Sequence, residues 1–169
     1  LKDARDSGIT CIHKTILPVG TTPPDAAFAQ AVLGIGRMEH EIDQHPDVLC
    51  RIRTVADIAV ARQSGRVGLI YGFQDGVAFE TDLSRLDELY RLGLRIVQPT
   101  YNRRNLLGDG CLEPANAGLS IAGVEAIEGR HVLVSRGQEE IRIVRTARHD
   151  LVDSVVDDDA RLLHLVHQL

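Results

Sequence analysis

The sequence predicts an α/β fold, either a doubly wound parallel sheet or part of a (β/α)8 barrel. Short apolar segments alternate with amphipathic ones along most of the 169 residues. Two of the amphipathic segments end at a glycine, Gly65 and Gly93, as is common at the carboxyl end of a helix. Repeated strand–helix units favour parallel strands joined by right-handed crossovers. About five strands with flanking helices are expected. Since a whole barrel takes about 250 residues, the barrel alternative is a partial, TIM-barrel-like one that holds roughly the first half.

The first expected strand–helix unit covers residues 8–46. Residues 8–13 are a short apolar run, and a proline-containing loop separates them from a long amphipathic segment. Asp25 is expected to cap this helix and Pro46 to end it. Apolar residues at steps of three and four predict its buried face, namely Phe28, Val32, Ile35, Met38 and Ile42.

Three further strands are expected at residues 47–53, 66–73 and 94–98. The helix between the first two begins at Thr54, with Asp57 at its third position to complete a capping box. The segment at 66–73 is almost wholly apolar, which is typical of a strand covered on both faces. The helix before the strand at 94–98 is expected to turn four side chains inward, those of Leu83, Leu86, Leu89 and Tyr90.

A polar loop of more than twenty residues follows the strand at 94–98. Ion pairs are expected to anchor this loop through its charged residues Arg103, Arg104, Asp109 and Glu113. Positive φ angles in tight turns are expected at Asn105, Gly108 and Gly110. Beyond the loop, Ser120 is expected to cap a short helix, and residues 131–135 are expected to form another strand.

Residues 138–169 differ in character from the rest of the chain. They contain an acidic run at 157–159 followed by an amphipathic segment. Negative charge in this position is typical of a helix N-terminus. We therefore divide the chain into a partial β/α domain at residues 1–137 and a helical segment at residues 138–169 that packs on it.

Composition and charge argue against several classes of function. The net charge is -5 and the 19 Lys and Arg residues are scattered, which disfavours a nucleic-acid surface. No run approaches the roughly 18 apolar residues of a membrane span, and the polar first residues do not resemble a signal peptide. The three cysteines are far apart, which fits a reduced compartment better than a disulfide framework. We expect a cytoplasmic location and small buried thiols.

Two segments, in order along the chain, carry a resemblance to a known family. They read RTVADIAVARQSGRVGLIYGFQDG from Arg53 and DLSRLDELYRLGLRIVQPTYNRRNLLGDGCLEPANAGLSIAG from Asp82. Together they resemble the membrane dipeptidase (renal dipeptidase) family of zinc peptidases, most strongly over residues 54–124. The resemblance implies a (β/α)8 barrel, an active site built by the loops after the strands, dipeptide substrates and two zinc ions as cofactors.

The resemblance also implies where the site residues fall. The family uses a His-x-Asp pair, which would lie before Leu1, a bridging Glu at a strand end, and two later histidines. The bridging position falls on Gln74, whose neutral amide does not bridge two cations as a carboxylate does. Asp75 is the weaker metal candidate, since successive strand residues point to opposite faces. A substrate-contacting turn position falls on Tyr101, whose hydroxyl can donate to an oxyanion, and Asn102 follows it.

The seven histidines offer no evident replacement for the missing ligands. His13 lies at the end of the first expected strand but has no partner two residues away, so we interpret it as a packed residue. His131 begins its expected strand and would lie at the wrong end for a ligand. His164 and His167 have a metal-binding spacing, but only the acidic run at 157–159 is near enough to complete a set. Surface positions are expected for His40, His45 and His149.

Two functions remain open from the sequence. One is a metal-dependent, dipeptidase-like protein that retains part of the substrate face, with dipeptides as substrate. The other is a non-catalytic relative that serves in binding or assembly. Half a barrel exposes strand edges and an apolar face, so we expect a homo-oligomer. An unrelated doubly wound binding protein has little support, because the chain has no GxGxxG or P-loop motif.

Overall fold

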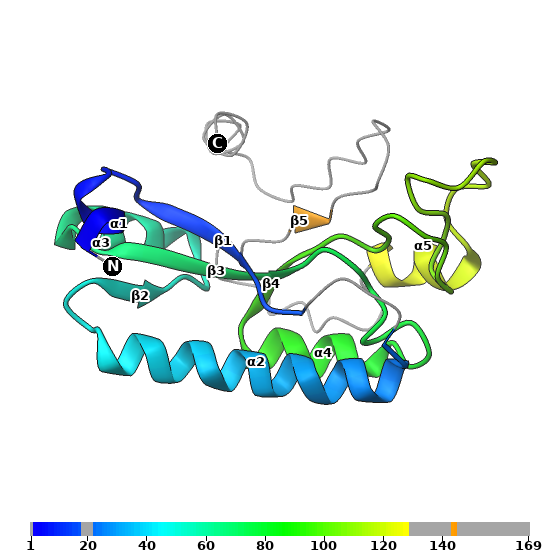
Figure 1. Ribbon diagram of the computed structural model, residues 1–169, viewed down its shortest axis with the longest axis horizontal. Coiled ribbons are helices and arrows are strands. Elements are labelled where there is room, and N and C mark those ends of the chain that lie inside the picture. The colour runs from blue at the N-terminus through cyan, green and yellow to red at the C-terminus, as the bar shows by residue number, and fades with distance from the viewer. Residues whose placement is uncertain (1, 18–21, 129–142, 145–169) are drawn as a thin grey trace.

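The computed structural model describes residues 2–17, 22–128 and 143–144, which form a five-stranded parallel sheet flanked by helices (Figure 1). The strands are β1 (Cys11–Thr15), β2 (Leu49–Arg51), β3 (Val67–Phe73), β4 (Leu94–Val97) and β5 (Ile143–Val144). The helices are α1 (Lys2–Asp6), α2 (Pro24–Gln44), α3 (Val55–Ser64), α4 (Ser84–Leu92) and α5 (Ile121–Glu128). The predicted α/β class with parallel strands is confirmed.

Strand β3 is the centre of the sheet. Along one edge it pairs with the whole of β1, with Cys11 opposite Gly68. Along its other edge, β2 pairs with its first three residues and β4 with its last three. β5 then pairs with β4. Because every pairing is parallel, the carboxyl ends of β1, β3 and β4 meet at one end of the sheet.

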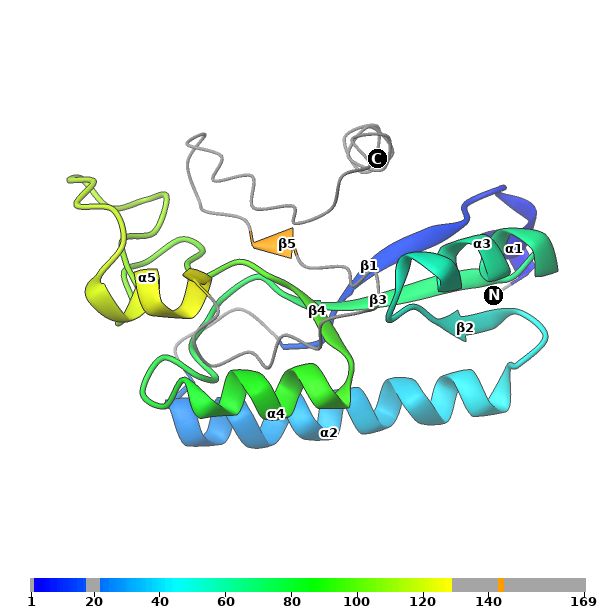
Figure 2. The ribbon, with the colours of Figure 1, turned by 180° about the vertical axis from the view of Figure 1, so that it is seen from behind.

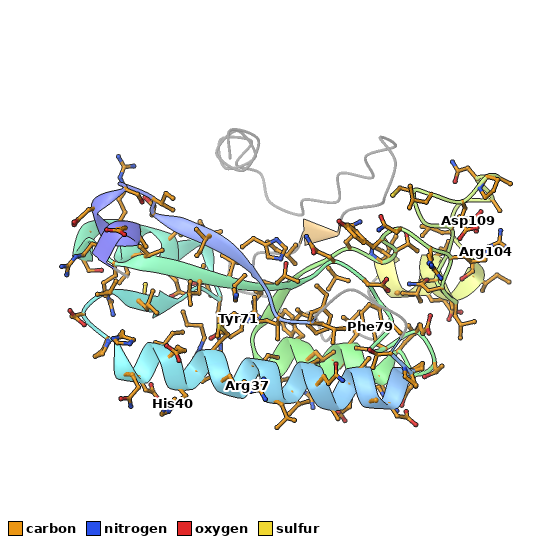
Figure 3. All side chains as sticks on the ribbon, viewed as in Figure 1. Arg37, His40, Tyr71, Phe79, Arg104 and Asp109 are labelled. Atoms are coloured by element: carbon orange, nitrogen blue, oxygen red, sulfur yellow. The ribbon has the colours of Figure 1, made fainter. Side chains whose placement is uncertain are left out.

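The larger part of the core lies between the sheet and helices α2 and α4, which run side by side along one face (Figure 2). Every second residue of β3 faces these helices, and Tyr71 and Phe73 are fully buried there. The hydroxyl of Tyr71 donates a hydrogen bond of 2.8 Å to Glu39 of α2. Figure 3 shows Tyr71 and Phe79 between the sheet and the two helices. This packing fixes the direction of β3 and therefore the position of its carboxyl end.

The opposite face of the sheet carries a smaller apolar cluster. Ile70 of β3 packs there with Cys50, Ile52 and Ala61. The β3 residues on either side of Ile70 that share its face are glycines, and side chains of the neighbouring strands lie over them. β3 thus has almost no side chain of its own on this face.

The predicted start of α3 and the predicted carboxyl ends of α3 and α4 are confirmed. The Thr54 hydroxyl accepts the Asp57 N–H, and the Asp57 carboxylate accepts the Thr54 N–H, which is the predicted capping box. Gly65 (φ 64°) and Gly93 (φ 118°) end the two helices in the left-handed conformation that glycine favours.

Two predictions for α2 were wrong. The helix begins at Pro24 without a side-chain cap, and Asp25 instead pairs with Arg85 of α4. Val32 is 37% exposed, because the small side chains of Ala27 and Ala31 are the ones buried against the core. The rest of the predicted face is confirmed, because Ile35 is buried and Phe28, Met38 and Ile42 pack against the core.

Two expected strands differ in position from the observed ones. The first lies at Cys11–Thr15 rather than at residues 8–13, because Gly8 adopts a φ of 77° and still belongs to the turn. The strand expected at 131–135 lies outside the described residues, and β5 is the described strand in this part of the chain. Most of residues 138–169 also lies outside the described residues, so the domain division stays a prediction.

Candidate functional site

The candidate site lies where β3 and β4 end side by side. Backbone pairing continues past the strands: Gln98 N–H donates to the Phe73 carbonyl at 2.9 Å, and Gly76 N–H donates to the Pro99 carbonyl at 3.0 Å. The two segments that leave the sheet are thereby held together. We call Gln74, Asp75, Tyr101 and Asn102, which lie on these segments, the strand-end site.

Each of the four side chains of the strand-end site is half-buried. The Tyr101 carbonyl accepts the Cys111 N–H at 2.8 Å, and the Asn102 carbonyl accepts the Leu112 N–H at 3.0 Å. The Asn102 side-chain oxygen also accepts from the Cys111 thiol at 3.4 Å. The main chain at Tyr101 and Asn102 is therefore fixed by a later part of the same loop.

Asp75 serves as an anchor between β3 and this loop. Its Oδ1 accepts hydrogen bonds from the side-chain amide of Asn105 at 3.0 Å and from the Val77 N–H at 3.1 Å. Burial raises the pKa of Asp75, although these hydrogen bonds oppose that shift. Metal binding by Asp75 stays a prediction, and the described contacts of its carboxylate are structural.

The inner half of the loop is bound to the body of the protein around Leu107. The Leu107 side chain is fully buried, and a Cβ at Gly76 or at Gly123 would collide with Leu107 atoms. Next to it, the Leu106 N–H donates to the Glu80 carboxylate at 2.8 Å, and the Ser120 hydroxyl donates to the Leu106 carbonyl at 2.6 Å. Ser120 also caps α5, as expected, by accepting the Gly123 N–H.

The outer half of the loop is held by charged side chains. Arg104 and Asp109 point toward each other and form the expected ion pair (Figure 3). The hydrogen bond from Arg104 holds the pKa of Asp109 below its ordinary value. The other Asp109 oxygen accepts the Ala117 N–H at 2.7 Å, and Glu113 accepts the backbone N–H of Arg104 at 2.7 Å. The long segment is therefore an ordered loop with its own internal bonds.

The expected positive φ angles at Asn105, Gly108 and Gly110 were wrong. In the loop, Gly118 has this conformation, with a φ of 75°. Gly108 and Gly110 are needed for close approach instead: a Cβ at Gly108 would lie 2.8 Å from the Gly118 carbonyl oxygen, and one at Gly110 would lie 2.5 Å from the Arg103 nitrogen.

The side chain of His13 lies on the face of the sheet that carries Ile70, opposite helices α2 and α4. Its imidazole lies over Gly72, and burial lowers its pKa. Gln74 follows Gly72 by two residues but lies in a bend beyond the end of β3, so strand alternation does not fix the direction of its side chain. His13, interpreted from the sequence as a packed residue, lies against Gly72 with one side of its ring, although the residue as a whole is exposed. His40 is exposed and His45 half-buried, and the four later histidines lie outside the described residues.

The cysteines were predicted as small buried thiols. All three are free, and Cys50 is buried as predicted, whereas Cys11 is half-buried and Cys111 is exposed. Burial and, to a smaller extent, the neighbouring Cys50 raise the pKa of Cys11 to about 11. This thiol therefore stays protonated near neutral pH. Neither Cys11 nor Cys50 is therefore a reactive group.

The described residues do not provide a two-metal centre. Gln74 offers one neutral oxygen, and the Asp75 carboxylate is already bonded to Asn105 and Val77. Within residues 2–17, 22–128 and 143–144, no three His, Cys, Asp or Glu side chains come together as a metal site would require. None of the helices in this part of the chain combines the length and the apolar character of a membrane span.

An open parallel α/β sheet with ordered polar segments at the strand ends fits the partial (β/α)-barrel alternative. The sequence profile of the membrane dipeptidase family (peptidase family M19) matches residues 4–134. The chain belongs to this family, whose members depend on zinc. None of the curated proteins compared with the sequence matches it.

Several solved structures share the fold. An amidohydrolase from Pseudomonas aeruginosa is 34% identical with a TM-score of 0.67, over 75% of this chain and 37% of that one. The probable dipeptidase PvdM from the same organism is 19% identical with a TM-score of 0.63, over 74% and 36%. A Rhodobacter sphaeroides metallo peptidase, liganded with a phosphinate mimic of the dipeptide L-Ala-D-Ala, is 22% identical with a TM-score of 0.58, over 66% and 34%. The chain thus spans little more than a third of each.

Proposed function

We propose that this chain forms a substrate-facing wall of a dipeptidase and that the protein hydrolyses dipeptides. One observation carries the proposal: in a chain that belongs to the family over residues 4–134, backbone hydrogen bonds hold the ends of β3 and β4 together, with Gln74 on one and Tyr101 on the other. The solved relative with a bound mimic of L-Ala-D-Ala supports a dipeptide as ligand.

Each polar side chain of the wall has a proposed role in this reaction. The Tyr101 hydroxyl donates a hydrogen bond to the peptide carbonyl oxygen as negative charge develops on it. The amides of Gln74 and Asn102 bind polar groups of the dipeptide and hold it in place. Because the Tyr101 and Asn102 main chain is already fixed by residues 111 and 112, little ordering is needed when the substrate binds. No role is assigned to zinc at the described residues, since they do not form a site for it.

Dipeptide binding by the purified chain tests the proposal. We expect alanyl-alanine to perturb the NMR signals of Gln74, Tyr101 and Asn102, and we expect Asn102→Ala to weaken binding. Asn116→Ala is the matched control, because Asn116 lies exposed in the outer half of the same loop and its side chain bonds only the nearby Gly118 N–H among the contacts described. Equal affinities of the two variants, or perturbations elsewhere alone, would contradict the proposal.

A second candidate is a non-catalytic relative that binds a dipeptide or assists assembly. The neutral Gln74 at the family's bridging position favours it, because a bridging carboxylate would balance the charge of two cations. An assay for free amino acids, with zinc added and withheld, separates the two candidates. Release of amino acids supports the dipeptidase, whereas binding without release supports the non-catalytic relative.

We also propose that the chain associates with copies of itself. Among the described residues, β1 is paired along one edge only, and Ile12 on it is 37% exposed. An unpaired strand edge is a template for pairing with another chain. Sedimentation equilibrium tests this, and a monomer at high micromolar concentration would refute it.

A further inference from the structure

We propose that Asn105 is a positioning residue, which sets the separation between Gln74 and Tyr101 by tying the ends of β3 and β4 to one side chain. The inference rests on the proposed function, in which these two residues face the substrate. Asn105 acts through the segments that it joins.

The side chain of Asn105 makes three hydrogen bonds to three separate segments. Its Nδ2 donates to Asp75 Oδ1 at 3.0 Å and to the Pro99 carbonyl at 2.7 Å, and its Oδ1 accepts the Leu107 N–H at 2.8 Å. Asp75 is adjacent to Gln74, and Pro99 precedes Tyr101 by two residues. One planar group therefore bonds the chain one residue from Gln74 and two residues from Tyr101.

The chemistry of these bonds requires an amide. Asp75 Oδ1 and the Pro99 carbonyl each accept a second hydrogen bond from Asn105, beside the one that each receives from a backbone N–H. The Leu107 N–H needs an acceptor, and among short side chains only that of asparagine carries two N–H donors beside a carbonyl oxygen. An aspartate at position 105 would place a second carboxylate against Asp75 and would leave the Pro99 carbonyl without this donor.

The packing around Asn105 leaves little freedom for the joined segments. A Cβ at Gly76 would lie 2.8 Å from the Pro99 carbonyl oxygen and would overlap the Leu107 side chain. The segment after β3 thus lies directly against both residues whose backbone groups bond Asn105. A change in the Asn105 hydrogen bonds is therefore transmitted to the backbone that precedes Tyr101.

Fluorotyrosine labelling reports on the surroundings of the Tyr101 ring, and its signal can be resolved because the chain has only three tyrosines. We expect the Tyr101 signal, identified with Tyr101→Phe, to shift in Asn105→Ala and Asn105→Asp, while the signals of Tyr71 and Tyr90 stay in place. Asp75→Asn is the conservative variant: its amide oxygen still accepts from Asn105, so the Tyr101 signal should remain close to that of the wild type. Asn116→Ala is the control within the same loop.

Affinity for alanyl-alanine provides the functional readout. We expect the dissociation constant to rise about tenfold in Asn105→Ala, since small misplacements of binding groups weaken recognition, and to stay within about twofold in the control Asn116→Ala. If Asn105→Ala does not fold, Asn105→Ser and Asn105→Asp carry the same comparison. An unchanged Tyr101 signal and an unchanged affinity in a folded Asn105 variant overturn the inference, even when the wild type binds the dipeptide. If the wild type binds no dipeptide but the Tyr101 signal shifts, the proposed function fails and the positioning role stands.

Discussion

The imidazole of His13 in β1 occupies the space above Gly72 of β3 in which a side chain of β3 would stand. A Cβ added at Gly72 would overlap the His13 ring and lie 3.0 Å from the Cβ of Ile96 in β4. Side chains of β1 and β4 thus meet over a single glycine of β3, two residues before Gln74 of the strand-end site. Gly72 is required there for close packing.

Substitution of Gly72 by alanine is expected to push His13 off the sheet. The side chain of Ile96 is fixed at its Cβ, so most of the adjustment falls on His13, and we expect a loss of about 1–3 kcal/mol in the free energy of unfolding. Urea denaturation measures this loss. In a His13→Ala background the same substitution should cost less, because the ring that it displaces is gone. An equal cost in both backgrounds would contradict the described contact.

The α2 helix offers a matched pair of glycines. A Cβ at Gly36 would meet nothing within 4 Å, whereas one at Gly34 would lie 2.8 Å from the Ile16 side chain and 3.1 Å from the Ile16 carbonyl oxygen. Gly36→Ala should therefore stabilise the protein by roughly 0.8–1 kcal/mol through helix propensity alone. Gly34→Ala should lose part or all of that gain, because the carbonyl cannot rotate away. Thermal unfolding of the two variants compares them, and equal stabilities would refute the prediction.

The elements that could be predicted from the sequence are those whose signals are local. The Thr54–Asp57 capping box and the helix-ending Gly65 and Gly93 depend on residues a few positions apart, and all were found as expected. The outward position of Val32 in α2 could not be predicted, because which apolar residues face the core depends on how closely Ala27 and Ala31 let the sheet approach. Apolar periodicity does not contain that information.

The candidate site was predictable only in part, for a similar reason. The resemblance located Gln74 and Tyr101 at strand ends, and the structure places those ends side by side. The role of Asn105 was missed, since its three partners lie between 2 and 30 positions away in the sequence. The glycines of the loop were recognised, but they permit close approach rather than positive φ, and close approach depends on tertiary packing.

The raised pKa of Asp75 predicts a pH dependence of stability. The ordinary value is 3.8 and burial raises it, so the folded protein binds this proton more tightly than the unfolded chain does. Ionising Asp75 therefore destabilises the fold as the pH rises from about 3.8 through the raised pKa, and the effect is constant above it. Asp75→Asn does not titrate. The free energy of unfolding of this variant minus that of the wild type should therefore increase through this interval and then level off. Urea denaturation at a series of pH values measures the difference, and a difference that falls with rising pH would contradict the assignment.

Gly110 is the loop residue at which the backbone itself leaves no room. A Cβ there would lie 2.5 Å from the Arg103 nitrogen, the Arg103 oxygen and the Asn102 carbonyl carbon. Because these are main-chain atoms, Gly110→Ala can be accommodated only if residues 102–103 move, which would stretch the 2.8 Å bond from Cys111 N–H to the Tyr101 carbonyl. We expect a loss of about 1–3 kcal/mol in the free energy of unfolding and faster hydrogen exchange at the Cys111 amide.

Gly118 provides the control for this last prediction, since it lies in the same loop and its constraint is of a different kind. It has a φ of 75° and open space where a Cβ would stand. Asparagine tolerates the left-handed conformation, so Gly118→Asn should change stability by less than about 0.5 kcal/mol and leave the Cys111 amide protected. If Gly110→Ala is as stable as Gly118→Asn and exchanges at the wild-type rate, residues 102–103 do not lie against Gly110. The main chain that carries Tyr101 and Asn102 would then be held by something other than this contact.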